Sequence, residues 1–470
     1  MFSSFSASSV SERGAARLVA AALVSGLVGV GLLTTAGAAV ADETPQNEAG
    51  AAATLGGLKT YGTAVVHDGD MDEQVPAGLF EMSVDNGGTL QTYCIDIHNP
   101  VQKDARYHET PWSATSLSGN KNAGKIRWIL RNSYPQVNDL AALAAEAGAK
   151  GLTEQDAAVG TQVAIWRFSD GADVDAVDPR AEKLADYLEK HARNLAEPAA
   201  SLSLVPSAVS GHPGERIGPV RVHTNADSVT VRPPADATAS GVKIVDRAGK
   251  EVTSAADGSR VYFEVPQSAQ DGSAELTVQA STTVPVGRAF ASETRSQTQI
   301  LAGSSESTVS ATATANWGDT GAIPALSAEK NCAEGGLDIT ADNQGDEPFT
   351  FTLMGVSHTI AAGKRETVTV PLLEDQAYDF TIKGPAGYEK HFKGVLDCRT
   401  ESSMGDLTVQ TLNEPSPATV GGMAAGDTDL AETGASNATP IIAGTAIALV
   451  VIGGAVLLLL RGKQPTPTRD

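Results

Sequence analysis

An uncharged apolar run near the C-terminus, Pro440–Leu460, constrains this chain more than any other feature. As a helix rising about 1.5 Å per residue, such a run spans the ~30 Å hydrocarbon core of a membrane. Arg461, Lys463 and Arg469 follow it, so the positive-inside rule predicts a cytoplasmic tail, residues 461–470, with the bulk of the chain outside. The rest of the sequence is therefore expected to fold in an oxidising compartment, where disulfides persist.

The N-terminus predicts export in the same direction. Basic residues precede an apolar run, Leu18–Leu33, and a small-residue cleavage site ends at Ala41. This order is that of a secretory signal, so we expect residues 1–41 to be a signal peptide and Asp42 to begin the mature chain.

A pentapeptide stands before the apolar run and consists of Leu430, Ala431, Glu432, Thr433 and Gly434. Together with that run and the basic tail, it resembles a Gram-positive cell-wall sorting signal in the LAxTG variant of the LPxTG pattern. The resemblance implies that a sortase cleaves between Thr433 and Gly434 and joins Thr433 to peptidoglycan. The membrane helix, 440–460, would then hold the chain only before sorting. Ala431 in place of proline suggests the sortase class of actinobacteria.

Composition limits the partners of the exported part. The net charge of −22 argues against nucleic acid. The sequence has no nucleotide-binding glycine signature, no CxxC and no paired histidines, and we expect neither cofactor nor metal.

The expected fold is multidomain: an α+β module followed by two all-β, Ig-like sandwich modules and a C-terminal transmembrane helix. The expected segments are a flexible stretch at 42–57, an α+β module at 58–198, β-sandwich modules at 201–316 and 325–412, and a linker at 413–429. A hairpin signal, Asp85–Gly88, and a capping box between Thr153 and Asp156 mark strands and helices in the α+β module. Short alternating runs separated by turn residues predict the sandwiches.

The sequence contains three cysteines. Cys332 and Cys398 lie near the two ends of the last β module, and a disulfide between them is expected to contribute about 4 kcal/mol. Metal binding is the alternative, without a supporting motif. Cys94, in the predicted strand "QTYCIDI", is left without a partner.

Cys94 allows several interpretations. It could be an inert buried thiol, or it could form a disulfide with another chain. It could also be the nucleophile of a secreted cysteine hydrolase, although His98 lies about 13 Å along the strand at ~3.3 Å per residue.

Gln162 suggests a further interpretation. On the helix around "TQVAIW" it shares an apolar face with Ala158 and Ile165, where an unsatisfied carboxamide costs about 1 to 3 kcal/mol. A hydrogen bond to a neighbouring loop or strand would satisfy it. Alternatively, the Cys94 thiolate attacks the Gln162 carboxamide, ammonia leaves, and an internal thioester remains.

The motifs "YCID" and "TQVAIW", in this order and in an exported chain, resemble the Cys-Gln thioester (TQxA) domain of Gram-positive surface proteins over residues 58–198. The resemblance implies that Cys94 supplies the sulfur and Gln162 the acyl group. Thr161, Ala164 and Trp166 match framework positions, and Tyr93 and Trp166 are expected to pack in the core. For Asp96, which follows the cysteine, a surface role and a chemical role both stay open.

The function that the resemblance implies is a wall-anchored adhesin. Its thioester would react once with an amine, most plausibly a lysine on an unknown surface ligand, so the protein would be a covalent binder and not an enzyme. The β modules would act as stalks. A non-covalent surface or structural protein with an inert Cys94, and a secreted cysteine hydrolase, are the alternatives.

Overall fold

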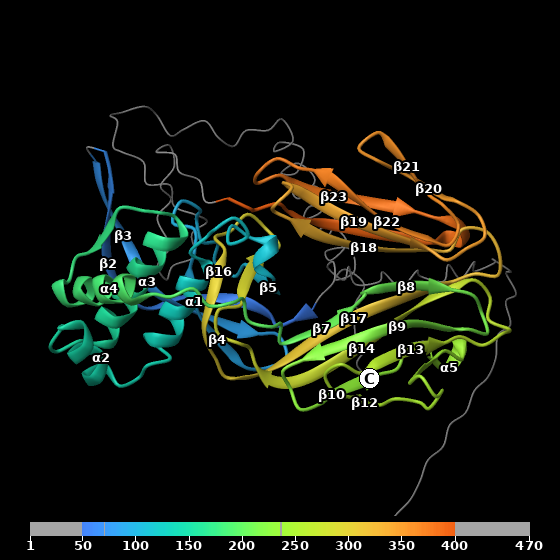
Figure 1. Ribbon diagram of the computed structural model, residues 1–470, viewed down its shortest axis with the longest axis horizontal. Helices are drawn as coiled ribbons and strands as arrows, with labels where there is room; N and C mark the ends of the chain where they lie inside the picture. The colour runs from blue at the N-terminus through green and yellow to red at the C-terminus, as the bar shows by residue number, and fades with distance from the viewer. Residues whose placement is uncertain (1–48, 70, 236, 400–470) are drawn as a thin grey trace, which may run out of the picture. The chain divides into compact units, whose positions relative to one another are not determined.

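The computed structural model of this chain describes residues 49–69, 71–235 and 237–399 (Figure 1). The signal peptide, the sorting motif with its linker and the apolar run at 440–460 lie outside these ranges. Within them, no helix is long and apolar enough to cross a membrane.

The first module is built on a 7-stranded sheet in the order β3-β4-β16-β15-β5-β2-β6. Its strands are β2 Ala52–Asp68, β3 Met71–Val84, β4 Thr89–Cys94, β5 Arg106–Thr110, β6 Val174–Ala176, β15 Ala289–Ser292 and β16 Gln299–Ser304. Because β2 also pairs with β3, the sheet closes on itself, and β4 lies inside the ladder between β3 and β16. Closure removes the exposed edges that an open sheet would present.

Four α-helices accompany this sheet: α1 Ala123–Asn132, α2 Leu140–Ala147, α3 Glu154–Ser169 and α4 Pro179–His191, with a short 3-10 turn, η1, at Trp112–Ala114. The predicted capping box is present, with Thr153 and Asp156 bonded to each other's backbone at the start of α3. Helix α3 is buried around most of its circumference, between β2 and β3 on one side and α4 on the other (Figure 1). Gly160 permits the close approach of α4, because a Cβ there would lie 2.5 Å from the Ala181 carbonyl oxygen.

Two expected boundaries of this module are corrected. The stretch expected to be flexible, 42–57, contains ordered strand from Ala49 onward, and Ala51, Ala53 and Leu55 are buried. Small alanines suggested a polar, loose segment, but in a closed sheet they fit where larger side chains would not. The end expected at residue 198 also fails, because β15 and β16 belong to the same sheet and come from residues 289–304.

The second module is a sandwich of two mainly antiparallel layers, and all its strands but β1 come from residues 202–317. One layer has the order β1-β17-β14-β10-β12 with β8 parallel to β17, and the other has the order β11-β13-β9-β7. The elements are β1 Ala49–Gly50, β7 Leu202–Val205, β8 Ala208–Gly211, β9 Arg216–Thr224, β10 Val229–Arg232, α5 Ala237–Ser240, β11 Lys243–Val245, β12 Ser254–Ala255, β13 Arg260–Glu264, β14 Gly272–Thr283 and β17 Glu306–Trp317.

Strands β14 and β17 pair continuously from Gly272↔Trp317 to Thr283↔Glu306. The chain between them leaves the sandwich, contributes β15 and β16 to the first module, and returns. This excursion is the feature of the fold that completes the site described below.

The third module is also all β. Its elements are β18 Pro324–Asn331, β19 Gly336–Asn343, β20 Phe349–Leu353, β21 Val356–Ile360, β22 Lys364–Pro371, β23 Ala377–Lys383, η2 Pro385–Gly387 and β24 Glu389–Val395. It has a separate apolar core that includes Leu326, Ile339 and Phe392. The predicted disulfide is confirmed, with Cys332 and Cys398 joined at an S–S distance of 2.00 Å.

Candidate functional site

Cys94 is the last residue of β4 and is completely buried, as a free thiol. The position inside the ladder agrees with the expectation that this strand is not an exposed edge. It also disfavours a disulfide to another chain, because no solvent-exposed path to the sulfur exists at 0% exposure.

The side chain of Gln162, on α3, is hydrogen-bonded to the backbone N–H and C=O groups of Cys94. Its Oε1 accepts from the Cys94 N–H at 3.0 Å, and its Nε2 donates to the Cys94 carbonyl oxygen at 2.9 Å. Pairing between β3 and β4 stops at Phe80↔Thr92, two residues before the cysteine. The glutamine carboxamide therefore takes the place that a further residue of β3 would occupy in the ladder, and the buried amide is fully hydrogen-bonded.

The sulfur of Cys94 has different partners. Gln299 Nε2 donates to Sγ at 2.9 Å, and Gln297 Oε1 is in direct contact with Sγ. Gln299 is the residue directly opposite Cys94 in the β16–β4 ladder, and Gln297 lies just before β16. Gln297 Nε2 donates to the Asp96 carbonyl oxygen, which turns the carbonyl end of this side chain toward the sulfur.

This arrangement revises the expected pairing of Cys94 with Gln162. Gln162 was placed near Cys94 correctly, but both ends of its carboxamide are used by the cysteine backbone. The side chain at the sulfur with its carbonyl oxygen is Gln297. Sequence reasoning missed Gln297 and Gln299 and predicted no strand there, although one signal was present: two glutamines in alternation just before an apolar run, both of which prove fully buried.

The framework residues pack as expected around this centre. Tyr93 and Trp166 are fully buried, and the Tyr93 hydroxyl donates to the Tyr134 carbonyl oxygen at 2.9 Å. Thr161 is buried and donates to the Ala157 carbonyl oxygen at 2.7 Å, one turn earlier in α3. Ala164 is buried as well. Among the described residues, none of these side chains is recorded as hydrogen-bonded to the sulfur, and their part is packing of the core.

Asp96 is buried, which removes the surface role left open for it. Its carboxylate accepts from the His98 N–H at 3.3 Å and from the Asn99 side-chain amide. Burial, and then the nearby Asp170 and Asp397 carboxylates, raise the pKa of Asp96 well above its usual range. Burial raises the pKa of Asp170 to about 7.

The Cys94 thiol lies in the same acidic surroundings. Burial raises its pKa well above the ordinary value, the Gln299 hydrogen bond opposes that rise, and Asp96 and Asp170 add to it. Among the described residues, the recorded hydrogen-bond partners of Sγ are Gln297 and Gln299. The surroundings favour a neutral sulfur, as in a thiol or a thioester.

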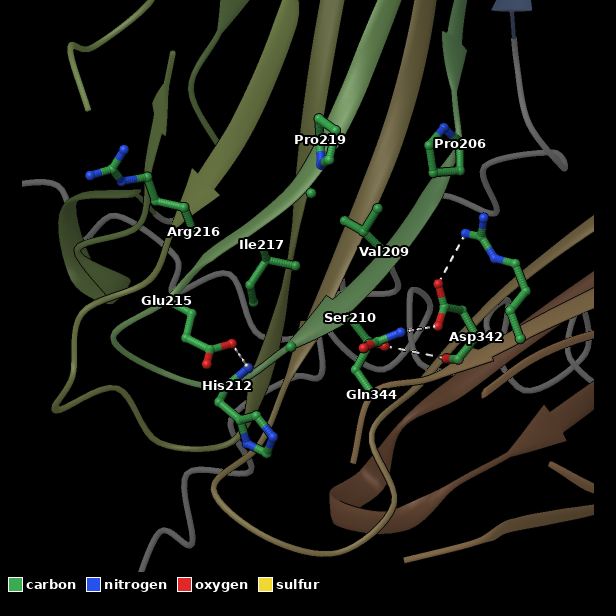
Figure 2. A pocket seen from close by; sticks show the side chains of 13 residues that line it. Pro206, Val209, Ser210, His212, Glu215, Arg216, Ile217, Pro219, Asp342 and Gln344 are labelled. Atoms are coloured by element: carbon green, nitrogen blue, oxygen red, sulfur yellow. Dashed lines mark hydrogen bonds and ion pairs between the residues drawn. The ribbon is translucent and has the colours of Figure 1, made fainter. Parts of the chain in front are cut away.

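A separate hollow of about 610 Å³ lies beside β8 and β9 (Figure 2). Asp342 is paired with Arg365 at 3.0 Å. Figure 2 shows Glu215 turned toward the backbone of His212, whose N–H donates to it. The hollow shares no residue with the Cys94 site. We assign it no part in the chemistry.

Residues 91–194 match the sequence model of the family described as Thioester domain, so this chain contains a thioester domain. The match covers Cys94 and Gln162 but ends before Gln297 and Gln299. Residues 323–395, in the third module, match the family described as Bacterial phospholipase C, C-terminal domain. No curated protein matches the chain by sequence.

Three solved structures are similar to the chain. The Bacillus anthracis TIE protein is 14% identical, covering 74% of this chain and 81% of its own, with a TM-score of 0.26. The thioester domain of the Enterococcus faecium TIE86 protein is 17% identical, covering 58% and 94%, with a TM-score of 0.28. The N-terminal thioester domain of a surface protein from Clostridium perfringens is 19% identical, covering 27% and 78%, with a TM-score of 0.20. These TM-scores are too low to support an inference about the fold or the site of this chain.

Proposed function

We propose that this protein is a wall-anchored surface adhesin that attaches covalently through an internal thioester between Cys94 and Gln297. The observation that carries the proposal is the buried contact between Cys94 Sγ and the carbonyl end of Gln297. The match of residues 91–194 to the Thioester domain family supports the chemistry. The export and sorting signals of the sequence support the location, although they fall outside the described residues.

Formation of the bond balances without a co-reactant. The Cys94 sulfur attacks the side-chain carbonyl carbon of Gln297, the C–N bond breaks, and the thiol proton leaves with the nitrogen as ammonia. The product is a thioester, an electrophile stored in the core. At 0% exposure, Cys94 and Gln297 are shielded from water.

Reaction with a target runs once. An amine, most plausibly that of a lysine on a surface ligand, attacks the same carbon, the C–S bond breaks, and the sulfur takes up the proton that the amine loses. An amide then joins Gln297 to the target, and Cys94 is again a thiol. Because nothing regenerates the thioester, the protein acts as a single-use covalent binder.

The test is the intact mass of the mature chain, residues 42–433. The wild type should lack one ammonia relative to its sequence, and both Cys94→Ala and Gln297→Ala should restore the full mass. Methylamine should add once to the wild type, at Gln297. A full mass in the wild type, with Cys94 alkylated only after unfolding, would overturn the thioester and show that Cys94 is an inert buried thiol. Turnover of peptide substrates would instead favour a cysteine hydrolase.

A further inference from the structure

We propose that Gln299 is a catalytic residue of this site, which stabilises the Cys94 sulfur by hydrogen bonding when the C–S bond forms and when it breaks, and that Thr92 positions it. The inference rests on the proposed thioester and deepens it. It assigns different tasks to the two glutamines at the sulfur: Gln297 supplies the acyl carbon, and Gln299 supplies a donor to the leaving group.

Gln299 is placed by the strand ladder. It lies directly opposite Cys94 in the antiparallel pairing of β16 with β4, so its side chain emerges on the same face of the sheet as the cysteine side chain. Its Nε2 donates to Sγ at 2.9 Å, and both residues are fully buried. The contact is thus a direct, dry hydrogen bond to one of the two reacting atoms.

Thr92 decides which end of the Gln299 carboxamide meets the sulfur. It precedes Cys94 by two residues on β4 and therefore shares its face. The Thr92 hydroxyl donates to Gln299 Oε1 at 2.9 Å, and this bond is buried. With Oε1 accepting from this hydroxyl, the NH₂ end of Gln299 is left to donate to the sulfur.

Gln297 is held in the opposite orientation by the same logic. Its Nε2 donates to the Asp96 carbonyl oxygen, and its Oε1 faces the sulfur. The acyl group therefore points its carbonyl at Cys94, whereas the neighbouring glutamine points its N–H groups there. Two residues of the same type, two positions apart, are differentiated only by their hydrogen-bond partners.

The chemistry needs a donor at this position. When an amine attacks the Gln297 carbon, the electron pair of the C–S bond passes to sulfur before a proton arrives. Burial and the carboxylates of Asp96 and Asp170 disfavour negative charge on this sulfur, and the Gln299 hydrogen bond favours it. Hydrogen bonds to charged groups are strong enough that losing one is expected to slow the step roughly tenfold to a hundredfold.

The experiment measures the rate at which hydroxylamine cleaves the thioester in the mature chain, followed by intact mass. Hydroxylamine is the probe because it stays unprotonated in mildly acidic solution, which allows a pH profile. Gln299→Ala should lower the rate roughly tenfold to a hundredfold, and Thr92→Val, which keeps the shape but loses the hydroxyl, should lower it by a smaller factor. Thr89→Val is the matched control, because Thr89 lies on the same strand but is exposed, and its rate should equal that of the wild type.

Gln299→Glu separates a chemical role from a structural one. In this variant the protonated carboxyl group can donate to the sulfur, whereas the carboxylate repels it, so the rate should rise relative to wild type as the pH falls. A packing defect would not respond to pH in this direction. If Gln299→Ala folds, by thermal unfolding, but shows no ammonia loss, peptide mapping of the wild type decides the meaning: methylamine at Gln297 shows that the donor is needed for formation of the bond as well, and methylamine at Gln299 overturns the inference.

The outcomes separate this inference from the proposed function. A wild type with full mass overturns the thioester and the inference with it. A wild type with the thioester, together with a Gln299→Ala rate equal to wild type and a flat Gln299→Glu profile, overturns the role of Gln299 alone.

Discussion

At the scale of the residue, the carboxamides around Cys94 differ in the end that each presents and in what it meets. Gln162 offers both ends to the Cys94 backbone, Gln299 offers its nitrogen to the sulfur, and Gln297 offers its oxygen. For a thioester to form, the sulfur has to reach a carboxamide carbon, and Gln297 is the residue whose carbonyl end contacts Sγ. Gln162 is thus expected to hold the nucleophile in place while Gln297 reacts with it.

Gln162→Ala tests this division. The change leaves the N–H and C=O of Cys94 without their partner in the core, which should lower the free energy of unfolding by about 2 kcal/mol or more. Urea unfolding measures the loss, and peptide mapping should still locate added methylamine at Gln297. Gln91→Ala is the control, because Gln91 is a half-buried glutamine on β4, the strand that carries Cys94, and its loss should cost less. Methylamine found at Gln162 in the wild type would restore the original pairing.

Asp170 gives a second prediction at this scale, on pH. Its pKa is about 7 in the fold, against about 3.9 in an unfolded chain, so the folded state binds more protons between these values. Stability from this group is therefore complete in acid and is lost as the pH rises toward 7.

Asp170→Asn removes that titration and should flatten the dependence of the melting temperature on pH. Above pH 7 the variant should be more stable than the wild type by about 1 to 3 kcal/mol, and near pH 4 the two should converge. Asp178, whose pKa is lowered to about 2 by hydrogen bonds from Arg180, is a control of opposite sign. Asp178→Asn should lose stability at neutral pH, and an equal response of both variants would contradict the assignment.

At the scale of the element, helix α3 and strand β16 meet at Cys94 from opposite sides. Helix α3 starts where the sequence predicts, because Thr153 accepts from the Asp156 N–H at 3.1 Å and Asp156 accepts from the Thr153 N–H at 2.9 Å. Strand β16 arrives through the connection between β14 and β17. The helix is thus specified locally, whereas the strand reaches Cys94 from between β14 and β17, more than a hundred residues beyond the helix.

Thr153→Ala tests the local part. Loss of the reciprocal cap should lower the free energy of unfolding by about 1 to 2 kcal/mol without changing the mass or the methylamine site. Asp139→Ala is the comparison, because Asp139 caps α2 by one bond to the Ala142 N–H and lies in no reciprocal pair. A smaller cost is expected there. Equal costs would show that the Asp156 arm of the cap contributes nothing.

At the scale of the whole molecule, one buried ion pair ties segments that are distant in sequence. Glu109 on β5 accepts from Arg288 Nε at 2.9 Å and from the Ser201 N–H at 2.8 Å, and its other oxygen accepts from the Ala51 N–H at 3.2 Å. Arg288 also meets Glu197 at 2.7 Å. The carboxylate thus joins the start of β2, the entry to the sandwich and the excursion that carries β15 and β16.

Arg288→Met should therefore be costly. It leaves the Glu109 carboxylate buried without its cation, and a loss of about 3 to 5 kcal/mol is expected in urea unfolding. The double variant Glu109→Leu with Arg288→Met removes both charges and should recover part of that loss. If the loss of unfolding free energy in the double variant equals the sum of the losses in the two single variants, Glu109 and Arg288 are not coupled as the contact implies.

The sequence was sufficient for much of the framework of this protein. It predicted the α+β module, the β-rich modules, the Cys332–Cys398 disulfide, the helix caps and the proximity of Gln162 to Cys94. The modules and caps depend on residues close in sequence, the disulfide on elimination among three cysteines, and the proximity of Gln162 to Cys94 on the resemblance to the thioester domain. Periodicity and capping act over a few positions, so a single chain reveals them.

Only the tertiary structure decided which side chains touch the sulfur. Gln297 is separated from Cys94 by 203 positions, and the contact exists because β16 leaves one module to pair with β4 in another. No local pattern encodes which distant strand completes a closed sheet, since many alternating runs in this chain could pair equally well. The sequence by itself determined that Cys94 is the odd cysteine among three, whereas the closure of the sheet decided that the carbonyl end of Gln297 meets its sulfur.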